Sequence, residues 1–179
     1  LDTTTGELLS MVGSKDFFDK TVDGEVNVAT RLRQPGSSIK PLVYATAFTK
    51  NFTPATVLAD IVTEFPGKDE KTPYIPKNYD GKEHGLLHLR EALASSINVP
   101  AVKLLALVGV DKVLSQGYKM GISSLEPTRE TISRVGLSMA LGGAELKLLE
   151  ISSAYAAFAN GGMKVTPVSI LKIEDNSGR

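Results

Sequence analysis

The segment RQPGSSIKPLVYATAF, residues 33–48, places a Pro-Gly break directly before an amphipathic helical pattern. Four apolar residues recur at the i, i+3, i+4 and i+8 spacing of one helix face, and Thr46 interrupts the edge of that face. These residues are Ile39, Leu42, Val43 and Ala47. At about 100° per residue, Ser37 and Lys40 lie within roughly one sixth of a turn of each other, away from the centre of this face. The pattern predicts a helix that runs from Ser37 to about Lys50.

The Ser-x-x-Lys spacing on the first turn has two interpretations. A serine hydroxyl is a poor nucleophile at neutral pH, and Lys40 could take the proton of Ser37 if burial or a nearby positive charge keeps its amine neutral. Unpaired N–H groups at the helix start would also favour negative charge on an acyl oxygen near Ser37. Alternatively, Ser37 is an ordinary helix N-cap and Lys40 an exposed helix residue.

The composition is that of a globular chain with a core. Among 179 residues, 42% are apolar, and 20 basic residues balance 20 acidic ones. Because the charges form no long block, we expect neither nucleic acid nor an anionic membrane surface as a partner. The chain has no cysteine, which excludes disulfides and thiolate metal sites. No apolar run approaches the roughly 20 residues of a membrane span, and the first residues lack a secretion signal, so we expect any leader or anchor to lie outside this segment.

The two histidines, His84 and His88, lie four residues apart. Only Glu83 and Glu91 supply carboxylates nearby. A histidine pair without a clear third ligand is weak support for a metal site, so the sequence favours a solvated loop here.

Apolar runs near both ends of the chain predict strands. Residues 8–12 form a short run suited to a covered strand, with Leu1-Asp2 as the tail of a partner strand. Residues 165–173 alternate imperfectly before a turn-like ending. Residues 14–36 form a long, mostly polar connection between the first strand and the helix. Strands at both ends around a helical middle predict an α+β fold in which the two ends meet in one sheet.

Helical patterns fill the middle of the chain. Residues 87–98 predict a short helix, because Pro100 disfavours helical geometry at the residue before it. Pro100 can open the next helix, which Gly109 should stop. Residues 110–120 predict another helix. A last helix within residues 144–162 carries Leu148, Ile151, Tyr155 and Phe158 on one face.

A second long loop covers residues 63–86, which are rich in Pro, Gly, Lys and Asp. It contains the turn sequence Asn78-Tyr79-Asp80-Gly81. Asn78 and Tyr79 are either exposed turn residues or the border of a substrate groove.

Ser96-Ile97-Asn98 stands at the end of the 87–98 helix, where a hydroxyl and an amide could converge with Ser37 and Lys40 on one cleft. Each motif is ordinary alone, but together they match the motif set of penicillin-binding proteins and class A β-lactamases. The chain resembles the transpeptidase domain of a bifunctional, class A penicillin-binding protein. The likeness runs in order through RQPGSSIKP, FTPATVL, YIPKNYDGKEHG, LREALASSINVPAVKLLALVGVDKV and EISSAYAAFANGG.

The resemblance implies a helical subdomain plus part of an antiparallel sheet, an incomplete form of the fold shared by penicillin-binding proteins and serine β-lactamases. It implies that Ser37 is the acylated nucleophile and Lys40 its base. Ser96 would relay a proton to the departing amine, and Asn98 would hold the peptide amide of the substrate and orient Lys40. The implied substrate is a peptidoglycan stem peptide ending in D-Ala-D-Ala. β-Lactams would acylate the same serine, and no metal or organic cofactor is required.

The sequence departs from this family in its third motif, K-T-G. The nearest triplet, Lys71-Thr72-Pro73, precedes Ser96 instead of following it. The upstream glycosyltransferase domain and the membrane anchor are also absent from residues 1–179. We therefore expect a partial transpeptidase domain of a protein anchored at the extracytoplasmic face of the bacterial cytoplasmic membrane. The fragment itself could be inactive, and its exposed sheet edges could pair into a dimer.

Three other functions stay open from the sequence. A D,D-carboxypeptidase would differ only in its acyl acceptor. A β-lactamase needs an activated deacylating water, but Glu126, Glu130 and Glu145 are more simply surface residues. A catalytically silent penicillin-binding or scaffold module would keep the fold; the missing K-T-G favours this for the fragment, whereas the four retained site residues favour an enzyme for the parent.

Overall fold

The chain divides into two units in the computed structural model, which describes residues 1–67 and 72–178. The second unit contains both sequence motifs. The first unit comprises Leu1–Arg33, Met120–Ser123 and Leu146–Arg179, and the second comprises Gln34–Lys119 and Ser124–Glu145.

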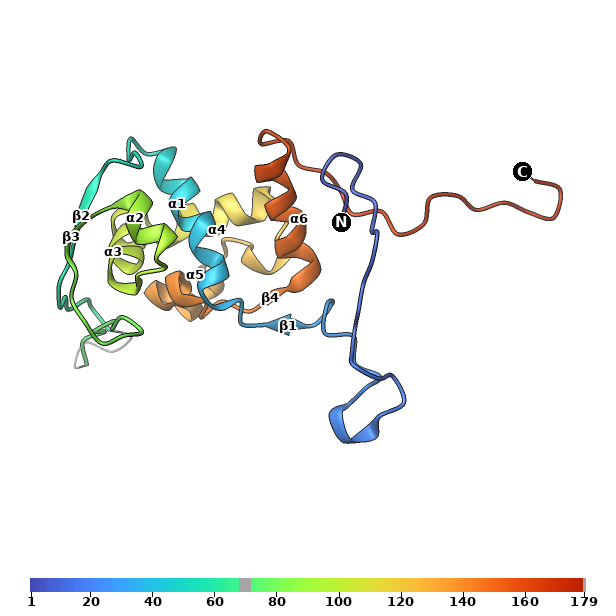
Figure 1. Ribbon diagram of the computed structural model, residues 1–179, viewed down its shortest axis with the longest axis horizontal. Helices are drawn as coiled ribbons and strands as arrows, with labels where there is room; N and C mark the ends of the chain where they lie inside the picture. The colour runs from blue at the N-terminus through green and yellow to red at the C-terminus, as the bar shows by residue number, and fades with distance from the viewer. Residues whose placement is uncertain (68–71, 179) are drawn as a thin grey trace. The chain divides into compact units, whose positions relative to one another are not determined.

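The predicted helix after Gly36 begins as a 3-10 turn. This turn, η2, covers Gly36–Ile39, and α1 follows over Lys40–Phe48 (Figure 1). Pro41 lacks an N–H and is tolerated in the first turn of α1, while the Lys40 N–H bonds to the carbonyl of Ser37. The predicted apolar face is confirmed, because all four of its residues are buried: Ile39, Leu42, Val43 and Ala47. Thr46 is buried as well, and its hydroxyl donates to the Leu42 carbonyl at 2.7 Å.

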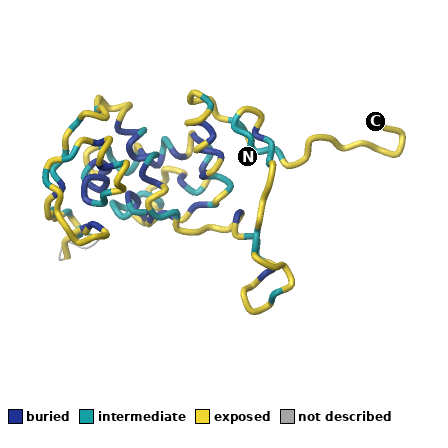
Figure 2. Tube along the Cα trace, viewed as in Figure 1, coloured by how far each residue is buried: buried dark blue, intermediate teal, exposed yellow. Residues whose placement is uncertain are grey.

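Helices surround α1 in the second unit. Their bounds are α2 Leu89–Ala94, α3 Asn98–Val108, α4 Val110–Lys119 and α5 Arg129–Val135, followed by the 3-10 helix η4 Gly136–Leu141. A further 3-10 turn, η3, covers Ser123–Leu125. α1 packs against α3 and α4, and this packing forms the buried centre of the unit (Figure 2). Gly117 permits the approach of α4, because a Cβ there would lie 2.9 Å from Leu42 Cδ2.

The predicted 87–98 helix is interrupted in the structure. Its first residues belong to strand β3, Gly85–His88, which pairs antiparallel with β2, Val57–Asp60, in the register Val57↔His88 (Figure 1). Within this range α2 covers only Leu89–Ala94 and Asn98 already begins α3, because short apolar runs such as Leu86-Leu87 do not separate strand from helix by period. The predicted stop at Gly109 is confirmed: this glycine follows α3 with a φ of +100°, a conformation that L side chains rarely adopt.

The first unit has less regular structure than predicted. Its elements are η1 Lys20–Val22, β1 Leu32–Arg33, β4 Leu146–Lys147 and α6 Leu148–Ala159. β1 and β4 pair antiparallel. The strands predicted for residues 8–12 and 165–173 are reduced to one parallel bridge, Glu7↔Val168. Val12, Ile170 and Ile173 are mostly exposed, so these apolar runs lack the covering surface that would stabilise a strand.

Apart from Ile151, the residues that share the predicted apolar face of α6 are not its buried residues. Leu148, Tyr155 and Phe158 are at least 40% exposed. The buried face consists of small residues: Ser153, Ala154, Ala156 and Ala157. Small side chains allow close packing on this face. The exposed rings of Tyr155 and Phe158 instead meet edge to face, with their centroids 5.8 Å apart.

The fold class is nevertheless confirmed. The described residues combine a helical subdomain with short antiparallel pairs, β1–β4 and β2–β3.

Candidate active site

The Ser37 side chain lies at the surface of the second unit, in the 3-10 turn before α1. Among the described residues no partner of its hydroxyl is found within hydrogen-bond distance. The preceding Gly36 has a φ of +57°, which turns the chain sharply into the helix. The exposed hydroxyl is therefore accessible to a substrate at the start of the helix.

Gly142 lies directly against the backbone of Gly36 in this turn. It follows η4 with a φ of +89°, and a Cβ at this position would overlap the backbone N and Cα atoms of Gly36. The site serine is thus carried on a backbone segment that rests against a glycine.

Replacing Gly142 by alanine is expected to destabilise the protein by about 2–5 kcal/mol, since left-handed strain and overlap with rigid backbone add together. Gly161→Ala is the matched control, because Gly161 has a φ of +59° but open space around an added Cβ. Urea unfolding of both variants measures the difference. Equal losses of stability would show that contact with Gly36 contributes nothing.

Lys40 is the first residue of α1 and is only 1% exposed. Its Nζ donates three hydrogen bonds: to the Ser96 carbonyl at 2.6 Å, to Ser96 Oγ at 3.1 Å and to Asn98 Oδ1 at 2.7 Å. The structure therefore brings Lys40, Ser96 and Asn98 together, and it excludes the interpretation of Lys40 as an exposed helix residue.

Burial lowers the pKa of Lys40 to about 8. The three acceptors are neutral oxygens, so no carboxylate among these partners offsets the cost of desolvating the ammonium. When the amine is neutral, it has one donor fewer and one lone pair more. The Ser96 hydroxyl can then reverse its role and donate to Nζ, which creates a path for a proton between the two groups.

Ser96 owes its position to the end of α2. Its N–H bonds to the Leu93 carbonyl and the next N–H, that of Ile97, bonds to the Ala92 carbonyl, which is the Schellman pattern of helix termination. The residue at the left-handed position of this motif is usually glycine, but here it is Ser96 with a φ of +52°. The strain of about 1–2 kcal/mol is consistent with a position selected for its hydroxyl.

Asn98 opens α3, and both ends of its side-chain amide are bonded. Oδ1 accepts from Lys40, and Nδ2 donates to the Lys77 carbonyl at 2.9 Å. Because Nδ2 has a carbonyl partner, the amide is oriented with its oxygen towards the lysine.

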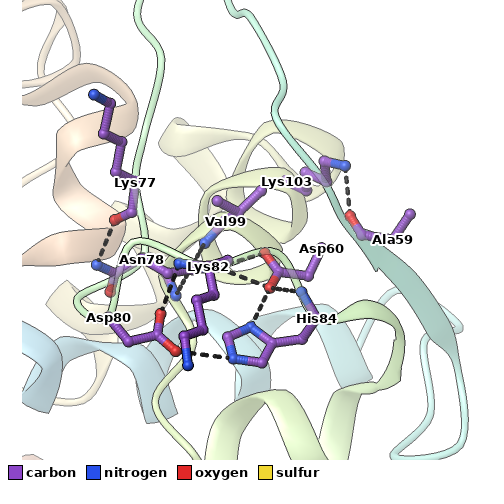
Figure 3. A network of polar contacts seen from close by, with 10 residues as sticks. Ala59, Asp60, Lys77, Asn78, Asp80, Lys82, His84, Val99 and Lys103 are labelled. Carbon is purple, nitrogen blue, oxygen red and sulfur yellow. Dashed lines mark hydrogen bonds and ion pairs between the residues drawn. The ribbon is translucent and has the colours of Figure 1, made fainter.

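A polar cluster around Asn78 and Asp60 is hydrogen-bonded to the start of α3 (Figure 3). The sequence did not single out Asp60, and it did not predict that Asn78 is buried. Asn78 is 8% exposed and Asp60 is fully buried, whereas Tyr79 is fully exposed. Burial thus contradicts the interpretation of Asn78 as an exposed turn residue. The one sequence signal for Asp60 was a lone carboxylate within the apolar run of residues 57–62.

The two histidines have different hydrogen-bond partners. His84 Nδ1 lies 2.6 Å from Asp60 Oδ2, and its Nε2 lies 3.1 Å from Asp80 Oδ2. The hydrogen bond to Asp60 raises the pKa of His84 above its ordinary value. His88 instead contacts the Ala55 carbonyl. Within residues 1–67 and 72–178, no group of three or more histidine and carboxylate side chains is placed to hold a metal ion.

The remaining candidates do not join the site. Glu126, Glu130 and Glu145 are exposed, as predicted. Lys71 of the Lys71-Thr72-Pro73 triplet lies outside the described residues. In the described part of the chain, no helix combines the length and the apolar character that crossing a bilayer demands.

The family model for the penicillin binding protein transpeptidase domain matches residues 1–178. Penicillin-binding protein 1A of Neisseria meningitidis serogroup A is 38% identical over 180 residues, and that of Aquifex aeolicus is 38% identical over 178 residues. These alignments cover 100% and 99% of this chain but 21% and 23% of the relatives, so the chain spans about a fifth of their length.

Solved structures show the same fold. Penicillin-binding protein 1A from Haemophilus influenzae has a TM-score of 0.75 at 33% identity, covering 88% of this chain and 23% of that chain. Penicillin-binding protein A from M. tuberculosis, solved as an imipenem acyl-enzyme complex, has a TM-score of 0.74 at 22% identity, covering 90% of this chain and 40% of that chain.

Proposed function

The chain belongs to the family of penicillin-binding protein transpeptidase domains, and on this premise we propose that it carries the nucleophile and base of a serine D,D-transpeptidase that cross-links peptidoglycan stem peptides. One observation carries the proposal. A buried lysine with a lowered pKa lies one turn after an exposed serine and contacts both polar residues of the second motif.

In the first half-reaction, the Ser37 hydroxyl gives its proton to neutral Lys40 while Oγ attacks the carbonyl carbon between the two terminal D-alanines. The C–N bond then breaks. The departing amine takes a proton from the Ser96 hydroxyl, which is replenished from the Lys40 ammonium. The balance is an acyl ester on Ser37 and free D-alanine.

In the second half-reaction, an amine of a neighbouring stem peptide attacks the ester carbonyl. The amine loses a proton to the Lys40 and Ser96 pair, and Ser37 Oγ leaves and recovers a proton. The product is a new peptide bond between two stems, with the enzyme returned to its starting state. Asn98 supports both steps by orienting Lys40 and by offering its amide to the substrate backbone.

The position of Ser37 also supports stabilisation of the oxyanion. The positive end of the helix dipole favours negative charge, which develops on the acyl oxygen in both half-reactions. We propose that the whole protein completes this site with a K-T-G strand, carries a glycosyltransferase domain and a membrane anchor, and works at the extracytoplasmic face of the bacterial cytoplasmic membrane.

β-Lactams are the proposed covalent inhibitors. Attack of Ser37 Oγ on the β-lactam carbonyl would open the ring, with the ring nitrogen taking the proton that a departing amine would take. The acyl-enzyme complex of the M. tuberculosis relative shows that a protein of this fold is acylated by such a drug.

Intact-protein mass spectrometry after incubation with penicillin tests this function in both the full-length protein and the 179-residue chain. We expect a gain of one whole drug mass in the full-length protein, located by fragmentation on the peptide that contains Ser37, because the ring-opened drug stays attached. An adduct on another peptide, or none in the full-length protein, would contradict the proposed function. An adduct on the 179-residue chain as well would show that the K-T-G strand is dispensable for acylation.

A further inference from the structure

A continuous set of hydrogen bonds links the Lys40 base to a buried carboxylate on strand β2. Lys40 donates to Asn98, the Asn98 N–H donates to Asn78 Oδ1 at 3.0 Å, and Asn78 Nδ2 donates to Asp60 Oδ1 at 2.9 Å and to Oδ2 at 2.8 Å. We propose that Asn78 and Asp60 are positioning residues for the acyl-transfer reaction, which act on Lys40 through Asn98. This inference rests on the proposed function, because it assigns roles within that reaction.

The amide of Asn78 has only one satisfactory orientation. Its nitrogen faces acceptors, namely the Asp60 carboxylate and the Lys82 carbonyl at 2.7 Å. Its oxygen faces two donors, the N–H groups of Asn98 and Val99 at 3.0 and 3.1 Å (Figure 3). Two donor hydrogens and two acceptor lone pairs are all the amide has, so its hydrogen-bonding capacity is used completely. A rotated amide would leave buried groups without partners.

Asn78 caps α3 from another part of the chain. Asn98 and Val99 are the first two residues of this helix, and their N–H groups have no partner within it. The residue before them, Ile97, has no side-chain oxygen to act as the N-cap. The oxygen of Asn78 takes that role and thereby fixes the start of the helix that carries Asn98.

The same loop also fixes the side chain of Asn98. The Lys77 carbonyl accepts from Asn98 Nδ2, so two consecutive loop residues hold the backbone and the amide of one site residue. With its nitrogen engaged there, Asn98 must present Oδ1 to Lys40 Nζ. The position of the loop therefore decides whether Lys40 keeps its polar partner.

Asp60 in turn fixes the loop. Its carboxylate is fully buried at the end of β2, where it accepts the amide of Asn78 and, through Oδ2, the N–H and Nδ1 of His84 at 2.9 and 2.6 Å. A buried carboxylate needs such donors, and it gains them only when residues 78–84 close around it. The placement of Asn78 is thus coupled to the burial of a charge.

The test compares Asn78→Ala with Asp80→Asn in the full-length protein. Asp80 bonds to Nε2 of His84 and to the Lys82 N–H, but among the described residues it has no hydrogen bond or ion pair with α3. The saturating acylation rate and the Kd for penicillin are measured at a temperature where circular dichroism shows each protein folded. We expect Asn78→Ala to lower the rate about 10- to 100-fold with little change in Kd, because the base is misplaced. Asp80→Asn should stay within about twofold of wild type.

A double-mutant cycle with Asn98→Ala separates positioning from stability. If Asn78 acts through Asn98, its replacement should have little further effect on the rate in the Asn98→Ala background. Equal effects in both backgrounds, or a wild-type rate for folded Asn78→Ala, would overturn the inference. If Asn78→Ala does not fold, His84→Ala serves instead, because it removes the side-chain partner of Asp60 Oδ2 and should slow acylation about 3- to 10-fold. An unchanged rate in His84→Ala would then overturn it. Absence of acylation at Ser37 in the wild type would instead refute the proposed function.

Discussion

Ser37→Ala is expected to lose the penicillin adduct completely, while the protein keeps its fold. The Ser37 hydroxyl is exposed and has no described partner, so its removal should change the free energy of unfolding by less than about 0.5 kcal/mol. Without Oγ there is no atom to form the ester, and the remaining site cannot hold the drug covalently. Intact mass spectrometry measures the adduct, and thermal unfolding measures the stability.

The adjacent serine supplies the matched control. Ser38 Oγ donates to the Pro35 carbonyl at 2.7 Å, within the 3-10 turn. Ser38→Ala should therefore keep the adduct and slow its formation by no more than about tenfold, since a neutral hydrogen bond within the turn is lost but the nucleophile is retained. Loss of the adduct in Ser38→Ala together with its retention in Ser37→Ala would show that Ser38, and not Ser37, is the nucleophile.

The segment around Ser37 shows what the sequence could predict. The i, i+3, i+4, i+8 face of α1 is buried as expected, because its spacing leaves one consistent way to pack a helix. The end of α3 at Gly109 was also predicted, because terminal signals of this kind are local and can be recognised in a single sequence.

The parts that sequence analysis missed depend on contacts between distant segments. The β2–β3 pair was missed because each strand is short and its partner lies 25 or more residues away. The burial of Asn78 was missed because Asn, Asp and Gly favour exposed turns, whereas its burial depends on Asp60. The buried face of α6 could not be identified from its large apolar residues, because its buried side consists mainly of alanines.

Burial of Lys40 could not be predicted from the sequence either. A lysine at the third position after a serine lies at the rim of the apolar face, where its side chain can point into solvent or inward. The inward direction results from three acceptors on Ser96 and Asn98, more than 50 residues further along the chain. The chemistry of the motif is therefore local in sequence, but its activation depends on tertiary structure.

Lys40→Met is expected to slow acylation by penicillin about 10²- to 10⁴-fold, the usual contribution of a positioned general base. Methionine fills a similar volume without a buried charge, so the fold should persist even though Ser96 and Asn98 lose their donor. Stopped-flow measurement of the saturating rate, with Kd determined in parallel, tests this prediction. A loss confined to Kd would indicate that Lys40 binds substrate but does not act as the base.

The pH dependence of both proteins gives the sharper test. Burial lowers the pKa of Lys40 to about 8, from an ordinary value of 10.5. Below this folded-state pKa the amine is mostly protonated and cannot accept the Ser37 proton. The wild-type rate should therefore rise with pH, with a midpoint near 8, and level off at higher pH. Lys40→Met should lack this rise.

The free energy of unfolding of the wild type should also depend on the titration of Lys40. Between the folded-state and ordinary pKa values of Lys40, about 8 and 10.5, the unfolded chain binds more protons than the folded one, so this residue makes the free energy of unfolding increase with pH. The increase should be absent from Lys40→Met, which removes the titrating group.

An acylation rate that rises with the same midpoint in both proteins would assign the titration to another residue. A flat wild-type profile would mean that the buried amine is already neutral well below pH 8, or that Ser37 is activated without it.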